Sequence, residues 1–76
     1  MGYSAHVEME LRFGGRTFSI GQMGGGMMTL EEPFDAGPGE GEVILTVDGV
    51  PRKWLVTIRD QPFPSHRITG EFRDPE

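Results

Sequence analysis

Hydrophobic and polar side chains alternate along the first part of the chain. Between His6 and Phe13 every second residue is apolar, and the residues between them carry charged or imidazole side chains. The apolar residues on one face are Val7, Met9, Leu11 and Phe13. A period of two is typical of a β-strand with one buried face. Gly14-Gly15 then favours the positive φ angles of a two-residue turn, and the alternation resumes over residues 16–20, so the pattern predicts a hairpin.

A second hairpin is predicted in the second half of the chain. Residues 42–47 and 52–59 both alternate, and Asp48-Gly49 between them begins a turn. The residues expected to point inward are Val43, Leu45, Val47, Trp54, Val56 and Ile58. The two hairpins provide four of the predicted strands.

Two shorter strands are predicted elsewhere. Residues 27–30 form one, ended by Glu31-Glu32-Pro33, and residues 67–72 form the other, with Ile68 and Phe72 on one face. Glycine and proline in residues 34–41 predict a loop there, and the two prolines of residues 61–64 interrupt any ladder.

The pattern predicts an all-β fold. Apolar residues do not recur at helical spacing, so we expect little or no helix. About six short strands with meander-like connections indicate a small antiparallel barrel or a rolled sheet. Residues 1–76 are expected to form a single domain, with residues 1–4 and 73–76 loose.

Composition narrows the classes of function. A chain of 76 residues can form one small domain with a thin core. Seven Lys and Arg against twelve Asp and Glu give a net charge of −5, which disfavours a general nucleic-acid binder because like charges repel, while leaving room for a local basic patch. Without cysteine there is no disulfide, thiolate ligand or thiol nucleophile. Such a domain needs tight packing, a ligand or a partner chain for its stability.

The sequence also carries expectations about location. The first twelve residues contain acidic side chains and no basic segment, so we expect no signal peptide. No apolar run approaches the roughly 20 residues that span a bilayer. We therefore expect a cytoplasmic protein without a membrane partner.

Part of the sequence resembles a known family. The run G-G-M-M-T-L-E-E-P…P-G-E-G-E-V-I-L-T-V-D-G resembles the centre of a PilZ-type barrel, and I-T-G-E-F-R-D-P-E is similar to how such domains close. The resemblance implies a barrel that binds a cyclic dinucleotide through an R-x-x-x-R pair and a D/N-x-S-x-x-G turn. Arg12 and Arg16 match the pair, although across a hairpin turn. With Gly26 as the last glycine of the turn, Gly21 and Met23 replace its hydrogen-bonding residues, so nucleotide binding does not carry over. The layout is also similar to that of small bacterial proteins of unassigned function.

The glycine-rich segment 21–28 poses a separate question. A phosphate-binding loop would need a lysine and a following helix, and both are missing. We expect instead a bulge, a corner of the barrel, or a close approach of a neighbouring strand. Met23, Met27 and Met28 could be Cu(I) ligands, but without cysteine or a nearby histidine we favour gap filling or contact with a partner.

Other candidate chemistry is sparse. His6 and Glu8 share a strand face, nothing brings His66 to them, and no serine has a nucleophile-elbow context. We therefore predict no metal, no cofactor and no enzyme activity. Arg52, Lys53 and Arg67 could form a basic stripe beside an aromatic ring for a nucleotide or a short single strand. In the alternative that we favour, the basic residues pair with carboxylates and Trp54 belongs to the core.

The leading hypothesis is a non-enzymatic binding or assembly module. It would act through protein–protein contacts, with a homodimer as the specific expectation, because short strands leave edges that need covering. The main alternative is a barrel that binds a nucleotide or another small anion, and a binder of short single-stranded nucleic acid is the weaker one. The residues of the anion site would be Arg12, Arg16, Gly24, Gly25 and Gly26.

Overall fold

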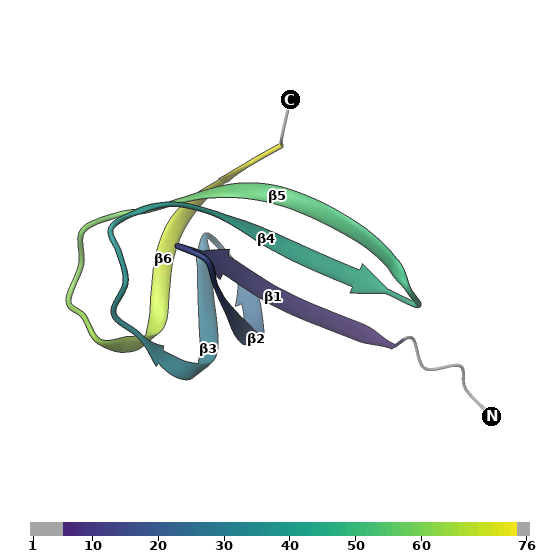
Figure 1. Cartoon of the computed structure of the whole chain (residues 1–76), viewed down its shortest axis with the longest axis horizontal. Helices are drawn as coiled ribbons and strands as arrows, with labels where there is room; N and C mark the ends of the chain where they lie inside the picture. Colours follow the sequence, from purple (N-terminus) through teal and green to yellow (C-terminus); the bar gives the residue numbers. More distant parts are fainter. Residues whose placement is uncertain (1–5, 75–76) are drawn as a thin grey trace.

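The computed structural model describes residues 6–74, which form six antiparallel strands closed into a small barrel (Figure 1). This confirms the predicted all-β fold. The strands are β1 (Val7–Phe13), β2 (Arg16–Gly24), β3 (Met27–Phe34), β4 (Gly39–Val47), β5 (Val50–Ile58) and β6 (Ser65–Arg73). Residues 6–74 contain no helix, and hence none with the length and apolar character needed to cross a membrane.

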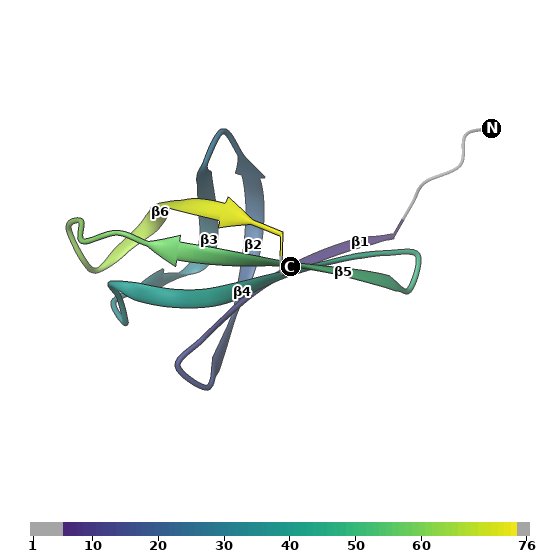
Figure 2. The same cartoon turned by 90° about the horizontal axis from the view of Figure 1, so that it is seen from above.

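The strand order around the barrel is β1-β2-β3-β6-β5-β4, and β4 pairs with β1 to close the ring. The connections are therefore not purely meander-like as predicted. After β3 the chain crosses to the far side of β1, and β6 returns to lie between β3 and β5. Figure 2 shows β6 beside β5 at the closed end of the molecule.

Two-residue turns join three of the strand pairs. Gly14-Gly15, Gly25-Gly26 and Asp48-Gly49 all have positive φ angles, as such turns require. The first and third were expected from the sequence. The second explains two glycines of segment 21–28, and a register shift between Ile20 and Gln22 is the predicted bulge.

Several strand boundaries differ from the prediction. β3 continues through Glu31-Glu32-Pro33 to Phe34, so the loop predicted for residues 34–41 shrinks to residues 35–38. The β3–β6 ladder is irregular between Thr29 and Phe34, which is the kind of place where a strand tolerates proline. Arg73 ends β6 and is not loose, whereas residues 1–4 and 75–76 of the segments predicted to be loose lie outside the described residues.

The hydrophobic core fills the closed end of the barrel. Phe34 is fully buried at its centre, and its ring makes edge-on contacts with three others at centroid distances of 5.2, 5.1 and 5.8 Å. These rings belong to Phe13, Phe18 and Phe63. The buried aliphatic residues are Leu11, Ile20, Met28, Leu30, Val43, Val56, Ile58 and Ile68. Because the sequence predicted a loop at residue 34, the role of Phe34 at the centre of the core was not predicted.

Candidate functional site

Three strands extend beyond the closed part of the barrel. The β1–β2 pairing starts only at Glu10 and the β5–β6 pairing only at Leu55, whereas β4 stays paired with both β1 and β5 as far as Val47. Residues 7–9, 44–47 and 50–54 therefore form a three-stranded sheet, which we call the extension. In Figures 1 and 2 it reaches away from β2, β3 and β6. It contributes to the longest dimension of the molecule, 44 Å.

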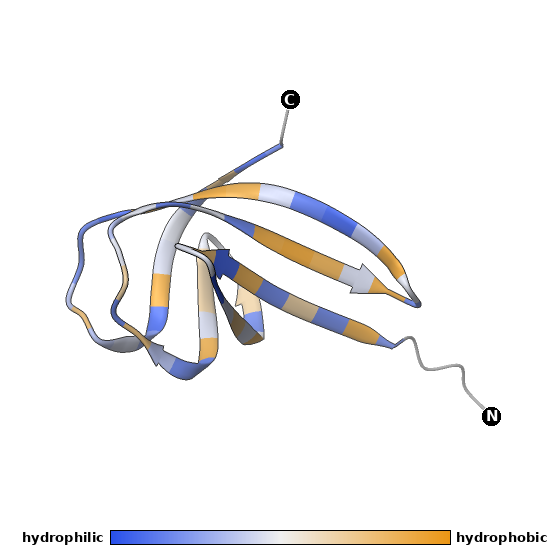
Figure 3. Cartoon of the chain, in the orientation of Figure 1, coloured by the Kyte–Doolittle hydropathy of each residue, from blue (hydrophilic) through white to orange (hydrophobic). Residues whose placement is uncertain are grey.

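The strand register places mostly apolar residues on one face of the extension. In Figure 3 hydrophobic and hydrophilic residues alternate along β1, and hydrophobic residues predominate along β4. The register aligns Val7, Val47 and Val50 in one row, and the next row begins with Met9 and Leu45. Val7 is 49% exposed and Val50 is 64% exposed, so this face lacks the cover that the core residues have. The face, which we call the inner face, consists of Val7, Met9, Leu45, Val47, Val50, Arg52 and Trp54.

The inner face continues directly into the core. Val43, the cross-strand neighbour of Trp54, is fully buried. Trp54 itself is only half-buried, so the expectation that it belongs to the core is wrong. The guanidinium carbon of Arg52 lies 5.7 Å from the centroid of its ring. Beside the indole is a mainly apolar hollow of about 230 Å³, lined by Met23, Gly24, Gly25, Gly26, Trp54 and Phe72.

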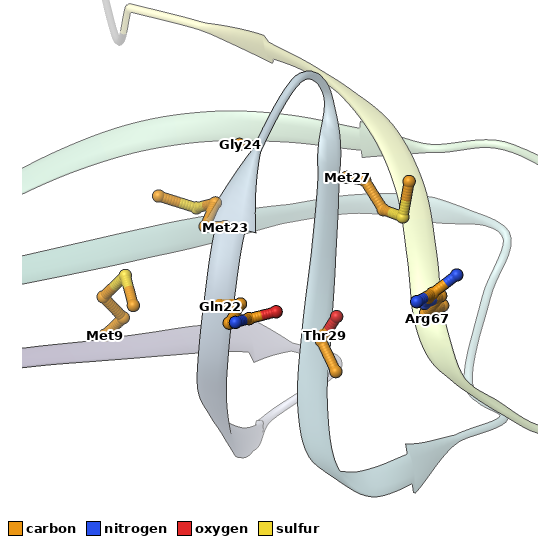
Figure 4. A pocket seen from close by; sticks show the side chains of 7 residues that line it. All are labelled: Met9, Gln22, Met23, Gly24, Met27, Thr29 and Arg67. Atoms are coloured by element: carbon orange, nitrogen blue, oxygen red, sulfur yellow. The ribbon is translucent and has the colours of Figure 1, made fainter.

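The three methionines near the glycines have different environments. Met28 is fully buried and is the cross-strand neighbour of the half-buried Met23, so both fill space on the barrel interior. Met27 lies on the opposite face and is 37% exposed. Figure 4 shows Met23 on β2 and Met9 on β1 at the side where these strands separate. Of the three methionines predicted to fill gaps or contact a partner, Met28 therefore fills a gap, Met27 is accessible to a partner, and Met23 is partly accessible.

The glycine turn has a packing role. The N–H of Gly70 on β6 donates a hydrogen bond of 3.0 Å to the carbonyl of Gly26. A β-carbon at Gly26 would lie 3.5 Å from the Gly70 carbonyl oxygen, and its φ of +75° disfavours other residues. Close approach of a neighbouring strand, one of the three predicted roles, therefore occurs at this turn.

The predicted anion-binding residues do not form one site. Phe13 and Arg16 are cross-strand neighbours, so Arg12 and Arg16 alternate in facing along the hairpin. Both line a hollow of about 450 Å³ around the turn, but Glu40 and Glu42 line it too, which disfavours an anion there. Arg16 lies over the Phe18 ring at 4.8 Å and reaches Asp35 at 4.0 Å. The glycine turn is at the far end of the nine-residue β2, at most about 26 Å along the strand at ~3.3 Å per residue. The structure therefore separates the arginines from Gly24, Gly25 and Gly26.

The predicted basic stripe is also divided. Because β5 and β6 run antiparallel, Arg67 lies toward the end of the barrel opposite to Arg52 and Lys53. Lys53 is 3.6 Å from Glu42, as the favoured alternative of pairing with carboxylates expects. The arginine–carboxylate pairs among the described residues are Arg12–Glu10, Arg16–Asp35, Arg59–Glu71 and Arg73–Glu40. These exposed pairs contribute little to stability individually.

Arg67 lies in a polar row on the outer face of the barrel. Gln22, Thr29 and Arg67 are cross-strand neighbours on β2, β3 and β6, and Figure 4 shows them around a hollow of about 580 Å³. His66 lies nearby on β6, with its Nδ1 atom 3.1 Å from the carbonyl oxygen of Leu30. Within the described part of the chain no three metal-ligating side chains gather at one place.

Comparisons of this chain with protein-family models, with curated proteins and with solved structures find no match. The resemblance to a PilZ-type barrel therefore stays a prediction. The structural observations that bear on function are those made on the chain itself, and the largest of them is the extension with its apolar inner face.

Proposed function

We propose that the protein is a non-enzymatic binding module that acts through protein–protein contacts and associates as a homodimer. The observation that carries this proposal is the extension, a single layer of sheet whose apolar inner face continues from the core into solvent. Exposed apolar surface costs about 25 cal/mol per Å², and contiguous patches of it mark interaction sites. The cytoplasm is the compartment that the sequence predicts for this activity.

The two faces of the extension differ in polarity, which supports a specific protein contact over nonspecific hydrophobic association. Its outer face carries charged residues, including Glu8 and Lys53, while its inner face carries aliphatic and aromatic side chains with Arg52 as the single charged residue. An apolar surface with a charged surround is typical of protein interfaces. In a chain of net charge −5, the charged surface keeps separate molecules apart unless the apolar faces or strand edges meet.

Sedimentation equilibrium over micromolar concentrations tests the homodimer. We expect a reversible dimer, whereas a folded monomer throughout this range would contradict the proposal. Replacing Val7 by lysine should weaken dimerisation at least about tenfold, or ~1.4 kcal/mol, because the charge loses solvation at the interface.

A matched control keeps this result interpretable. Thr17→Lys adds the same charge at an exposed position of β2, outside the extension. It should leave the dimerisation constant nearly unchanged. Circular dichroism of both variants checks that the barrel is folded, since Val7 is half exposed and a lysine there has room.

A further inference from the structure

The extension has two open strand edges. Among residues 6–74, no strand pairs with the side of residues 7 and 8 of β1 that faces away from β4, or with the corresponding side of residues 50–54 of β5. Unpaired edges offer backbone N–H and C=O groups to another strand, and proteins usually block those that stay in solvent. The two edges of the extension differ in this respect.

The β5 edge is blocked by its sequence. A two-residue turn makes Val47 and Val50 the hydrogen-bonded pair, so the next residue, Pro51, turns its nitrogen toward the open side. Proline has no N–H to donate there. Lys53, the following residue with the same orientation, adds a charge, which also discourages pairing with another chain.

The β1 edge has no such block. The N–H of Asp48 donates to the carbonyl of His6 at 2.8 Å, which shows that the backbone of His6 faces β4. In an antiparallel ladder this orientation alternates, so Glu8 also faces β4, and the backbone groups of Val7 and Met9 face away from it. Met9 lies where the β1–β2 ladder begins, so its carbonyl is directed at β2, whereas Val7 lies beyond that ladder. Val7 is not proline, so it offers both a donor and an acceptor at the open side.

We infer that two copies of this chain associate by antiparallel pairing of their β1 edges, with Val7 at the two-fold axis. This inference rests on the proposed function, since it specifies the surface of the homodimer. The pairing would join the two extensions into one six-stranded sheet, with a barrel at each end. It uses the same edge of both copies, as a symmetric dimer requires.

Side-chain complementarity selects the register of this pairing. With Val7 opposite Val7 of the second copy, His6 lies opposite Glu8 of that copy, and the reciprocal pair forms on the other side of the axis. His6 Nε2 already lies 2.9 Å from Glu8 Oε2 within one chain, so these groups can hydrogen-bond. A shift of the axis to Glu8 would put the two Glu8 side chains opposite each other, which is unfavourable. A shift to Met9 would require Leu11, which already pairs with β2.

Cysteine cross-linking tests the register directly, because the sequence contains no cysteine. In a hydrogen-bonded antiparallel pair the Cα atoms are about 5.5 Å apart, within disulfide range. Val7→Cys should therefore form a disulfide-linked dimer under mild oxidation. Glu8→Cys is the matched control, since its two Cα atoms would be diagonal neighbours about 7–8 Å apart and should link much more slowly.

The outcomes separate this inference from the proposed function. A monomer of the unmodified chain at micromolar concentrations would remove both. A dimer in which Glu8→Cys links faster than Val7→Cys would overturn the register. A dimer in which neither variant links would show that the chains meet elsewhere, leaving the proposed function intact and this inference wrong.

A charge exchange provides a second test with a different readout. His6→Glu places a carboxylate opposite Glu8 of the second copy at two symmetric positions, which should weaken dimerisation on the order of tenfold. Adding Glu8→Lys to the same chain should restore it. If the double variant stays as weak as His6→Glu alone, His6 and Glu8 do not face each other between copies, and the Val7-centred register is wrong.

Discussion

Replacing Phe34 by alanine is expected to lower the free energy of unfolding by about 3–5 kcal/mol. Phe34 is fully buried and its ring contacts those of Phe13, Phe18 and Phe63, so its removal leaves a cavity among aromatic side chains that cannot collapse together. For a 76-residue chain the total stability is on the order of 4–11 kcal/mol. The variant should therefore be partly unfolded at physiological temperature.

Chemical denaturation at fixed protein concentration measures this loss, because dimerisation would make the apparent stability depend on concentration. Phe63→Ala is the matched control. The same atoms are removed, but from a ring that is only half-buried at the margin of the core. The decrease in the free energy of unfolding should be clearly smaller for Phe63→Ala than for Phe34→Ala. An equal or larger decrease would show that Phe34 is not the centre of the core.

The second large effect is expected at Gly41, where a single added methyl group has no space. A β-carbon there would lie 2.6 Å from the carbonyl oxygen of Arg12 and 2.9 Å from Cδ2 of Phe13. The first atom belongs to the backbone of β1 and cannot rotate away. Gly41→Ala should therefore force β1 and β4 apart and lower the free energy of unfolding by about 1–3 kcal/mol.

Gly24→Ala is the control for this substitution. A β-carbon at Gly24 meets no atom within 4 Å, and this glycine does not have a positive φ. Alanine there should be neutral or stabilise the protein by up to about 1 kcal/mol, because it restricts the unfolded chain. Thermal unfolding of the two variants measures this difference as a difference in midpoint temperature. A midpoint for Gly41→Ala at or above that of Gly24→Ala would contradict the close packing of Gly41 against β1.

The parts of the fold that could be predicted are those that a pattern within a few neighbouring residues determines. Alternation and two-residue turns are local, so β1, residues 16–20 of β2, and most of β4 and β5 could be predicted with the direction of their side chains. The position of Phe34 depends on a ladder irregularity in β3, and flanking proline and glycine made a loop the natural prediction. The order of the strands around the barrel could not be predicted, because no residue pattern within β3 or β6 indicates that these two strands pair.

The candidate site was predicted less completely. The residues of the inner face could be recognised as apolar, but alternation alone assigned Val7, Leu45 and Trp54 to the same buried surface as Leu11. What separates them is the length of β1, β4 and β5 relative to their neighbours, which only the register reveals. The R-x-x-x-R spacing likewise does not tell toward which face of the sheet each arginine points. The register across the hairpin turn shows that Arg12 and Arg16 alternate in direction.

The position of β6 has a consequence for how the protein folds during synthesis. This strand is the sixth in chain order, yet it pairs with both β3 and β5. Until β6 is added, β3 and β5 each present an unpaired edge, and the ring cannot close. A chain that contains β1 to β5 without β6 is therefore an incomplete barrel with two open strand edges, and such edges let aggregation compete with folding.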